Sequence, residues 1–200
     1  MEETSDPEAF IAGTIAHSQI GHNTDPKSKL DMFYRIATSG GAEKADIMFF
    51  KFCYVDFNSQ TDVSALFEIY RNTLEQLKNK YVQTTFIHLT TPLTTIQSGI
   101  KAWIKKIVGR SVSGEAENIK RHEFNEMIRK AYLEKEPVFD LAKIESTFPD
   151  GRRATFNANK NTYYYLVPEF TTDGGHLNNK GKKAVAEQLL IFLINIVKNQ

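Results

Sequence analysis

The chain has 200 residues, of which 41% are hydrophobic and 24% are charged, and its formal net charge is +1 at pH 7. This length allows one domain, residues 1–200, with a substantial core. The composition is that of a soluble globular protein. Lysine and arginine are spread along the chain without a dense cluster, so no nucleic-acid partner is expected.

The N-terminus and the longest apolar run exclude further classes. The first seven residues are acidic and polar, so the chain carries no recognisable secretory signal. The apolar run 189–197 is far shorter than the roughly 20 residues that span a bilayer. Cys53 is the single cysteine, which rules out an internal disulfide and leaves the compartment open. The sequence does not indicate an oligomeric state.

The first third of the chain predicts a strand, a helix and a second strand. Residues 10–16 form a short apolar segment that favours a strand. Asp25 is a predicted N-cap with Pro26 at the first helical position, and Gly40–Gly41 should end that helix. Residues 45–52 are almost continuously apolar, as expected for a strand that is covered on both faces.

The remainder of the chain is predicted to continue this alternation. The expected elements are a helix through Val63, Leu66, Phe67, Tyr70, Leu74 and Leu77, a strand over 84–89, a helical excursion around Trp103 within 93–114, a helix through Phe124, Met127, Ile128 and Ala131, a strand over 138–142, a loop or hairpin over 148–170, and a closing helix over 179–198. Strands that alternate with helices predict an α/β fold, a three-layer α/β/α arrangement around a parallel sheet. In such sheets, functional residues gather at the C-terminal ends of the strands.

The most specific motif lies in residues 172–181, just before the closing helix. Asp173 precedes His176 by three residues, across two glycines. A nucleophilic hydroxyl needs a base with a pKa near neutrality, which imidazole supplies. The imidazole needs an acceptor that fixes its tautomer, and Asp173 can provide it. The alternative is that Asp173 caps a turn and His176 packs at the helix entrance.

Other candidate sites are weaker. His17, His22 and Asp25 lie close together in sequence, but their spacing is not that of a zinc site, so no metal is expected. His88 lies in an apolar strand and is expected to be a core histidine with its polar atoms satisfied. Cys53 follows a strand and could be a nucleophile, but a lone cysteine there more often packs as a small hydrophobe. Lys51, Tyr54 and Asp56 either line a pocket or are solvated strand ends.

The block Asp173-Gly174-Gly175-His176-Leu177-Asn178, with Gly181 and a closing helix, resembles the last signature block of the SGNH/GDSL hydrolase superfamily. The resemblance implies a flavodoxin-like three-layer sheet and a Ser-His-Asp triad that contains Asp173 and His176. It also implies a serine esterase that acts through an acyl-enzyme on a small-molecule or carbohydrate acetyl ester, without a cofactor. Members of this family are often exported.

The chain departs from the family in two places. No Gly-Asp-Ser motif precedes Phe10, and no Gly-x-Asn-Asp motif follows the strand at 45–52. Either Ser18 is the nucleophile of a shortened fold, or the chain begins after the nucleophile strand and lacks the first central strand. The second explanation is favoured, because only one predicted strand precedes Ser18.

The resemblance also assigns the side of the site that stabilises the oxyanion. Residues 17–26 match the family's second block, so Gly21 and Asn23 are expected to lie on the oxyanion side. Backbone groups near Cys53 and Tyr54 are expected to complete it. The competing hypothesis is a catalytically inactive binding module that keeps the fold and has lost its nucleophile.

Overall fold

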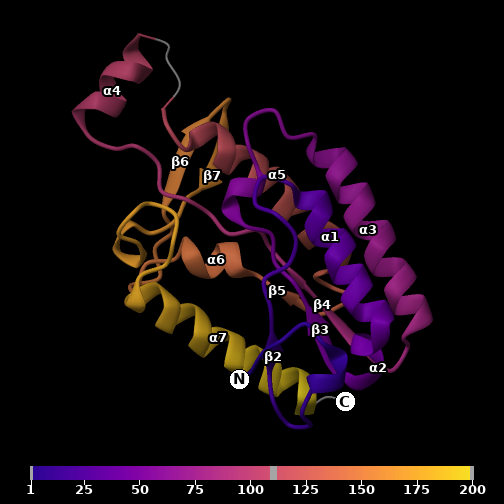
Figure 1. The fold of residues 1–200 in the computed structure, drawn as a ribbon. Helices are drawn as coiled ribbons and strands as arrows, with labels where there is room; N and C mark the ends of the chain where they lie inside the picture. The colour runs from indigo at the N-terminus through magenta and orange to yellow at the C-terminus, as the bar shows by residue number, and fades with distance from the viewer. Residues whose placement is uncertain (1, 109–111, 199–200) are drawn as a thin grey trace.

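The computed structural model describes residues 2–108 and 112–198, and its centre is a three-stranded parallel sheet. The strand order is β3–β4–β5, formed by Ile47–Phe49, Thr85–Leu89 and Val138–Phe139 (Figure 1). Ile47 pairs with Thr85, and His88 pairs with Val138. Parallel strands need crossover connections, and helices provide them here.

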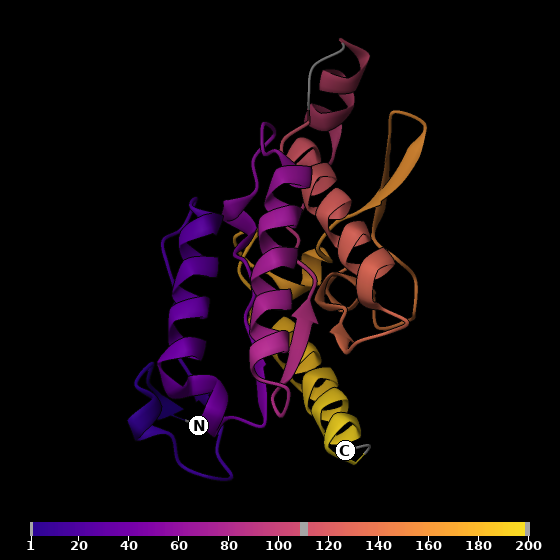
Figure 2. The same cartoon turned by 90° about the vertical axis from the view of Figure 1, so that its right-hand side faces the viewer.

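Helices cover both faces of this sheet. One face carries α1 (Pro26–Ile36), α3 (Val63–Lys80) and α5 (Glu115–Tyr132), which lie side by side in Figure 2. The other face carries α6 (Leu141–Glu145) and α7 (Asn179–Lys198). The predicted three-layer α/β/α fold is therefore confirmed.

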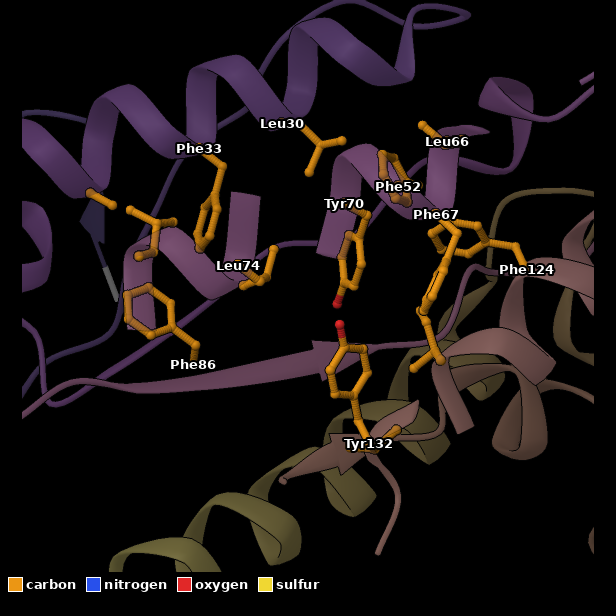
Figure 3. Close-up of a cluster of buried hydrophobic side chains, with 14 of the residues drawn as sticks. Leu30, Phe33, Phe52, Leu66, Phe67, Tyr70, Leu74, Phe86, Phe124 and Tyr132 are labelled. Atoms are coloured by element: carbon orange, nitrogen blue, oxygen red, sulfur yellow. The ribbon is translucent and has the colours of Figure 1, made fainter. Parts of the chain in front are cut away.

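Strand β4 shows why both faces are buried. Phe86 packs in the core beneath α1, α3 and α5, whereas Ile87 and Leu89 pack in the core beneath α7. The alternation follows from the strand's period of two. The first core is rich in aromatic rings, and Figure 3 shows Phe33, Phe86 and Tyr70 among its members.

His88 is the satisfied core histidine that the sequence predicted. Its ring is fully buried. Nδ1 lies 2.6 Å from the Tyr70 hydroxyl, and Nε2 lies 2.9 Å from a Glu136 carboxylate oxygen. Burial lowers the pKa of His88 to about 4, so the ring is neutral at physiological pH and serves the core.

The local start and stop signals of α1 act as predicted. The Asp25 carboxylate accepts a hydrogen bond from the Ser28 amide at 3.2 Å, and Pro26 is the first helical residue. The π-helical turn η2 (Ala37–Gly41) then ends the helical path at Gly40, which has φ +110°. The short helix α2 (Ala42–Lys44) leads into β3.

The predicted strand over 10–16 is wrong. Its middle is a turn closed by the Thr14 amide on the Ile11 carbonyl at 3.2 Å. Only Ala16–His17 is extended, as β2, and it pairs with β1 (Glu2–Glu3) apart from the main sheet. Ile11 and Ile15 are exposed, so this segment lacks the buried apolar face that a strand of the main sheet has.

Two other strands are shorter than predicted. The apolar run 45–52 contributes only Ile47–Phe49 to the sheet. The segment 138–142 contributes Val138–Phe139, because Asp140 accepts the Lys143 amide and thereby begins α6. A capping carboxylate in an apolar run is a helix start signal that the sequence interpretation did not use.

The remaining elements complete the chain. They are η1 (Pro7–Ala9), η3 (Tyr54–Asp56), α4 (Ile100–Ile107), the hairpin of β6 (Thr155–Ala158) and β7 (Asn161–Tyr164), and η4 (Pro168–Phe170). The hairpin and the helix around Trp103 were predicted, although 109–111 of that excursion lie outside the described residues. Within the described ranges, none of the helices combines the length and apolarity needed to cross a membrane.

Candidate active site

The loop before α7 holds Asp173 and His176 together through its own backbone. Asp173 Oδ1 accepts the amides of Gly175 at 2.9 Å and His176 at 2.8 Å. Asp173 Oδ2 lies 2.6 Å from His176 Nδ1. The pKa of Asp173 lies well below its usual range because its carboxylate accepts these hydrogen bonds. The Gly175 amide has the largest effect, followed by the His176 ring and then the His176 amide. The carboxylate therefore stays charged throughout the neutral range.

This arrangement fixes the tautomer of His176. An ionised carboxylate can only accept a hydrogen bond, so Nδ1 carries the proton and donates the hydrogen bond to Asp173. In the neutral ring the lone pair is then on Nε2. A base with a free Nε2 and a carboxylate on Nδ1 is what activation of a hydroxyl requires.

A second segment anchors the loop. The Thr95 amide donates to the Gly174 carbonyl at 2.8 Å. Gly174 has φ +90°, a conformation that favours glycine. A side chain at Gly175 would place its Cβ 2.5 Å from the Tyr54 ring. The geometry therefore requires both glycines: Gly174 for its positive φ, and Gly175 because a side chain there would collide with the Tyr54 ring.

Tyr54 joins the site from the turn η3, 122 residues away in sequence. Its hydroxyl lies 3.3 Å from Nδ1 and 3.4 Å from Nε2 of His176, and the two rings meet edge to face. The near-equal distances place the hydroxyl between the two nitrogens, so it is not in line with the Nε2 lone pair. Burial, followed by the charges of Cys53 and Asp173, raises the pKa of Tyr54.

Arg121 holds the backbone of Tyr54 in place. Its Nε and Nη2 donate to the Tyr54 carbonyl at 3.1 and 2.8 Å, and its Nη1 donates to Asn118 at 2.7 Å. The side chain is buried, and burial lowers its pKa to about 10. It therefore stays charged at neutral pH.

The sequence interpretation missed Arg121 and Asn118, although a signal was present. Both lie on the buried stripe of α5, which continues through Asn125, Ile128 and Tyr132. Asn118 exchanges two hydrogen bonds with the backbone of Thr94. Three polar residues on the apolar face of one helix indicate side chains that are satisfied by backbone from elsewhere.

A buried ion pair connects the second predicted block to η3. Lys29 Nζ lies 2.6 Å from Asp56 Oδ2 and 3.1 Å from the side-chain oxygen of Asn23. Asp56 also accepts the amides of Thr24 at 3.0 Å and of Cys53 at 2.7 Å. The loop that carries Asn23 and the turn that carries Tyr54 are therefore held against each other.

Gly21 and Ser18 lie in different surroundings. Gly21 has φ +56°, and a Cβ there would lie 2.5 Å from the Lys29 amide, so this glycine lets the loop pack on the start of α1. Ser18 directly follows β2 and is partly buried. Among the described residues, no hydrogen bond joins Ser18 to His176, and Ser18 does not line the cleft that Asp173 lines.

An open cleft of about 830 Å³ lies beside the Asp173–His176 pair. Its lining comes from four parts of the chain: Tyr54, Val55 and Phe57; Thr94, Thr95, Ile96, Gln97 and Lys105; Ser113, Gly114, Glu117 and Arg121; and Asp173, Gly174 and Gly175. The lining is mostly polar. The cleft opens at the C-terminal side of β3 and β4, where the α/β rule places function.

Cys53 contributes backbone rather than side chain to this region. Its amide is occupied by Asp56, whereas the amides of Tyr54 and Val55 have no acceptor within 2–108 and 112–198. The thiol is partly buried and does not line the cleft. In the described part of the chain, histidine, cysteine and acidic side chains do not gather into a group of three that could hold a metal ion.

Comparisons with known proteins support the fold. No protein-family model matches the chain, and no curated protein matches it. A solved structure from Bacteroides fragilis, provisionally named an acylhydrolase, superposes with a TM-score of 0.60 and 18% identity. The superposition covers 92% of this chain and 76% of that one. A structure from Streptococcus pneumonia, provisionally named a platelet activating factor, gives a TM-score of 0.55 and 16% identity over 93% of this chain and 76% of that one.

Proposed function

We propose that residues 1–200 act as one domain of an SGNH/GDSL-type ester hydrolase, in which His176 is the general base and Asp173 orients it. The observation that carries the proposal is the 2.6 Å contact between His176 Nδ1 and Asp173 Oδ2, because it leaves Nε2 free to accept a proton. The fold is similar to that of the provisionally named acylhydrolase, and the pair lies beside a cleft.

The proposed reaction proceeds through an acyl-enzyme. A serine hydroxyl attacks the ester carbonyl carbon and passes its proton to His176 Nε2. The bond from the carbonyl carbon to the alcohol oxygen then breaks, and the alcohol leaves with that proton. Water next gives a proton to Nε2 and attacks the acyl carbon, after which the serine takes the proton back. Serine, histidine and carboxylate suffice, so no cofactor is required.

The proposed oxyanion donors come from the two segments that Asp56 joins. The Tyr54 amide is one, because it borders the cleft and has no acceptor among the described residues. The side-chain amide nitrogen of Asn23 is the second, since the oxygen of that side chain already accepts from Lys29. Gly21 shapes the loop that presents Asn23. The Cys53 amide is excluded, because it donates to Asp56.

Ser18 is the candidate nucleophile among the residues of this chain. It must approach His176 on substrate binding, since no contact joins them in the described residues. The polar lining at Thr94, Thr95 and Gln97 suits a small hydroxyl-rich substrate such as a carbohydrate acetyl ester.

A binding module without catalysis is the alternative function. The position of Ser18, away from the cleft, favours it. In that case Asp173 and His176 would bind a ligand in the cleft without turning it over. The two functions differ in whether an activated serine exists.

Hydrolysis of p-nitrophenyl acetate by the purified chain tests the proposal. We expect the wild type to exceed His176→Ala by about 10²–10⁴-fold, the usual contribution of a positioned general base. Ser18→Ala, tested beside a fluorophosphonate label, locates the nucleophile: loss of label and activity assigns Ser18. Wild-type activity equal to that of His176→Ala, with no labelling, would overturn the proposal for this chain and favour the binding module.

A further inference from the structure

Helix α4 projects from the body of the molecule with its apolar side uncovered. Figure 1 shows it apart from the other helices, and in Figure 2 it projects at the top of the molecule beyond the end of α5. Ile100, Ile104 and Ile107 are 78%, 49% and 62% exposed, and Val108 directly after the helix is 59% exposed. Their spacing of four, three and one residues places them along one side of the helix.

The charged residues of the same segment are all positively charged. Residues 100–108 contain three lysines and no aspartate or glutamate. Lys105 is held by the neutral side chain of Gln97 at 2.7 Å. Within the described residues, no carboxylate neutralises the Lys105 ammonium. The helix is therefore amphipathic and cationic.

Helix α4 lies at the same end of the molecule as the cleft. Lys105 lines the cleft, as do Gln97 before the helix and Gly114 after it. Gly99 and Gly114, at the two ends of the excursion, have φ +81° and +86°. The uncovered side of α4 thus belongs to the same end of the molecule as the cleft.

We propose that α4 docks on an anionic lipid surface, with its isoleucine side chains in the interfacial layer and Lys105 toward the headgroups. A short helix with an apolar side and a lysine-rich polar side lies in the plane of such an interface. Each lysine near a negatively charged surface adds about 1 kcal/mol of attraction. Charge favours a lipid surface over a neutral protein groove, because an apolar groove offers no anionic groups to a segment that contains three lysines and no acidic residue.

The single tryptophan of the chain makes the test direct. Trp103 falls within α4, so its fluorescence reports on this helix alone. The chain is titrated with vesicles of phosphatidylcholine and with vesicles that also contain phosphatidylglycerol. We expect a blue shift and quenching by brominated lipid with the anionic vesicles, and both should weaken as salt is raised.

Two matched variants identify the surface. Ile104→Ser with Ile107→Ser removes apolar area from α4, and we expect vesicle partition to weaken by about tenfold or more. Leu190→Ser with Ile194→Ser removes side chains that are 53% and 52% exposed on α7, and partition should be unchanged. Far-ultraviolet circular dichroism checks that both variants are folded.

Three results would overturn the inference. The first is the absence of a fluorescence change with anionic vesicles. The second is an equal loss of binding in the α4 and α7 variants. The third is self-association without lipid that only the α4 variant abolishes, which would assign the surface to a second copy of the chain. Vesicle binding is measured without turnover, so this inference and the proposed esterase activity fail separately.

Discussion

The ammonium group of Lys29 lies 2.6 Å from Asp56 Oδ2, and the two side chains are only 6% and 0% exposed. They are 27 residues apart in sequence. Asp56 also receives the amides of Thr24 and Cys53. The pair therefore fixes the position of Asn23 relative to the turn that carries Tyr54.

Removing one partner of the buried pair should destabilise the fold. Asp56→Ala leaves a buried ammonium and two amides unsatisfied, so we expect the free energy of unfolding to fall by about 3–5 kcal/mol. Urea denaturation measures it. Glu187→Ala breaks an exposed pair with Lys183 and is the matched control, with little expected change. Equal losses in the two variants would contradict a structural role for the Lys29–Asp56 pair.

Replacing Gly21 with alanine should lower the free energy of unfolding more than replacing Gly13 with alanine. Both glycines have positive φ, +56° and +75°, and alanine in that region costs about 1–2 kcal/mol. Gly13 has open space around its Cβ position, whereas a Cβ at Gly21 meets the Lys29 amide at 2.5 Å. We expect Gly21→Ala to lose about 1–3 kcal/mol more than Gly13→Ala. Thermal unfolding of both variants checks it, and equal melting temperatures would count against this packing.

Glu145 should make the protein less stable as pH rises. Its buried carboxyl accepts the Leu93 amide at 2.7 Å, and burial raises its pKa from 4.5 to about 8. Folding therefore favours the protonated form. The Glu145 contribution is fully present below pH 4.5 and is lost as pH rises through the folded pKa of about 8, at up to about 1.4 kcal/mol per pH unit.

Glu145→Gln isolates this effect. The amide oxygen can still accept from Leu93, but the side chain cannot ionise. We expect the variant and the wild type to have the same free energy of unfolding near pH 4.5. Near pH 8 the variant should be the more stable of the two. Glu123→Gln, on the exposed side of α5, should leave the pH dependence unchanged. A wild type and Glu145→Gln with the same slope would show that the carboxyl does not titrate in this window.

The tautomer of His176 can be observed without a substrate. Long-range proton–nitrogen spectra should show neutral His176 protonated at Nδ1, because Asp173 Oδ2 accepts there at 2.6 Å. Asp173→Asn should abolish that preference and reduce ester hydrolysis by about 10²-fold or more. The ring of His22, which has no carboxylate partner in the described residues, is the internal reference. An identical tautomer ratio for the two histidines would contradict the orienting role of Asp173.

Elements whose signals are local could be predicted from the sequence. The Asp25–Pro26 start of α1, the helical spacing of α3 and the bounds of α7 were all predicted. The three-layer fold followed from their alternation. The strand at 10–16 failed, because an apolar segment becomes a strand only where a neighbouring strand and a covering layer exist.

The proximity of Asp173 and His176 could be predicted from the sequence, because backbone hydrogen bonds within one short loop suffice to hold them together. The residues that surround this pair come from distant parts of the chain and could not be predicted in the same way. Tyr54 reaches His176 across 122 residues, and Arg121 reaches the Tyr54 carbonyl across 67. Such contacts depend on how the sheet brings the ends of its strands together and on which polar side chains are buried there. Short-range spacing carries no information about either.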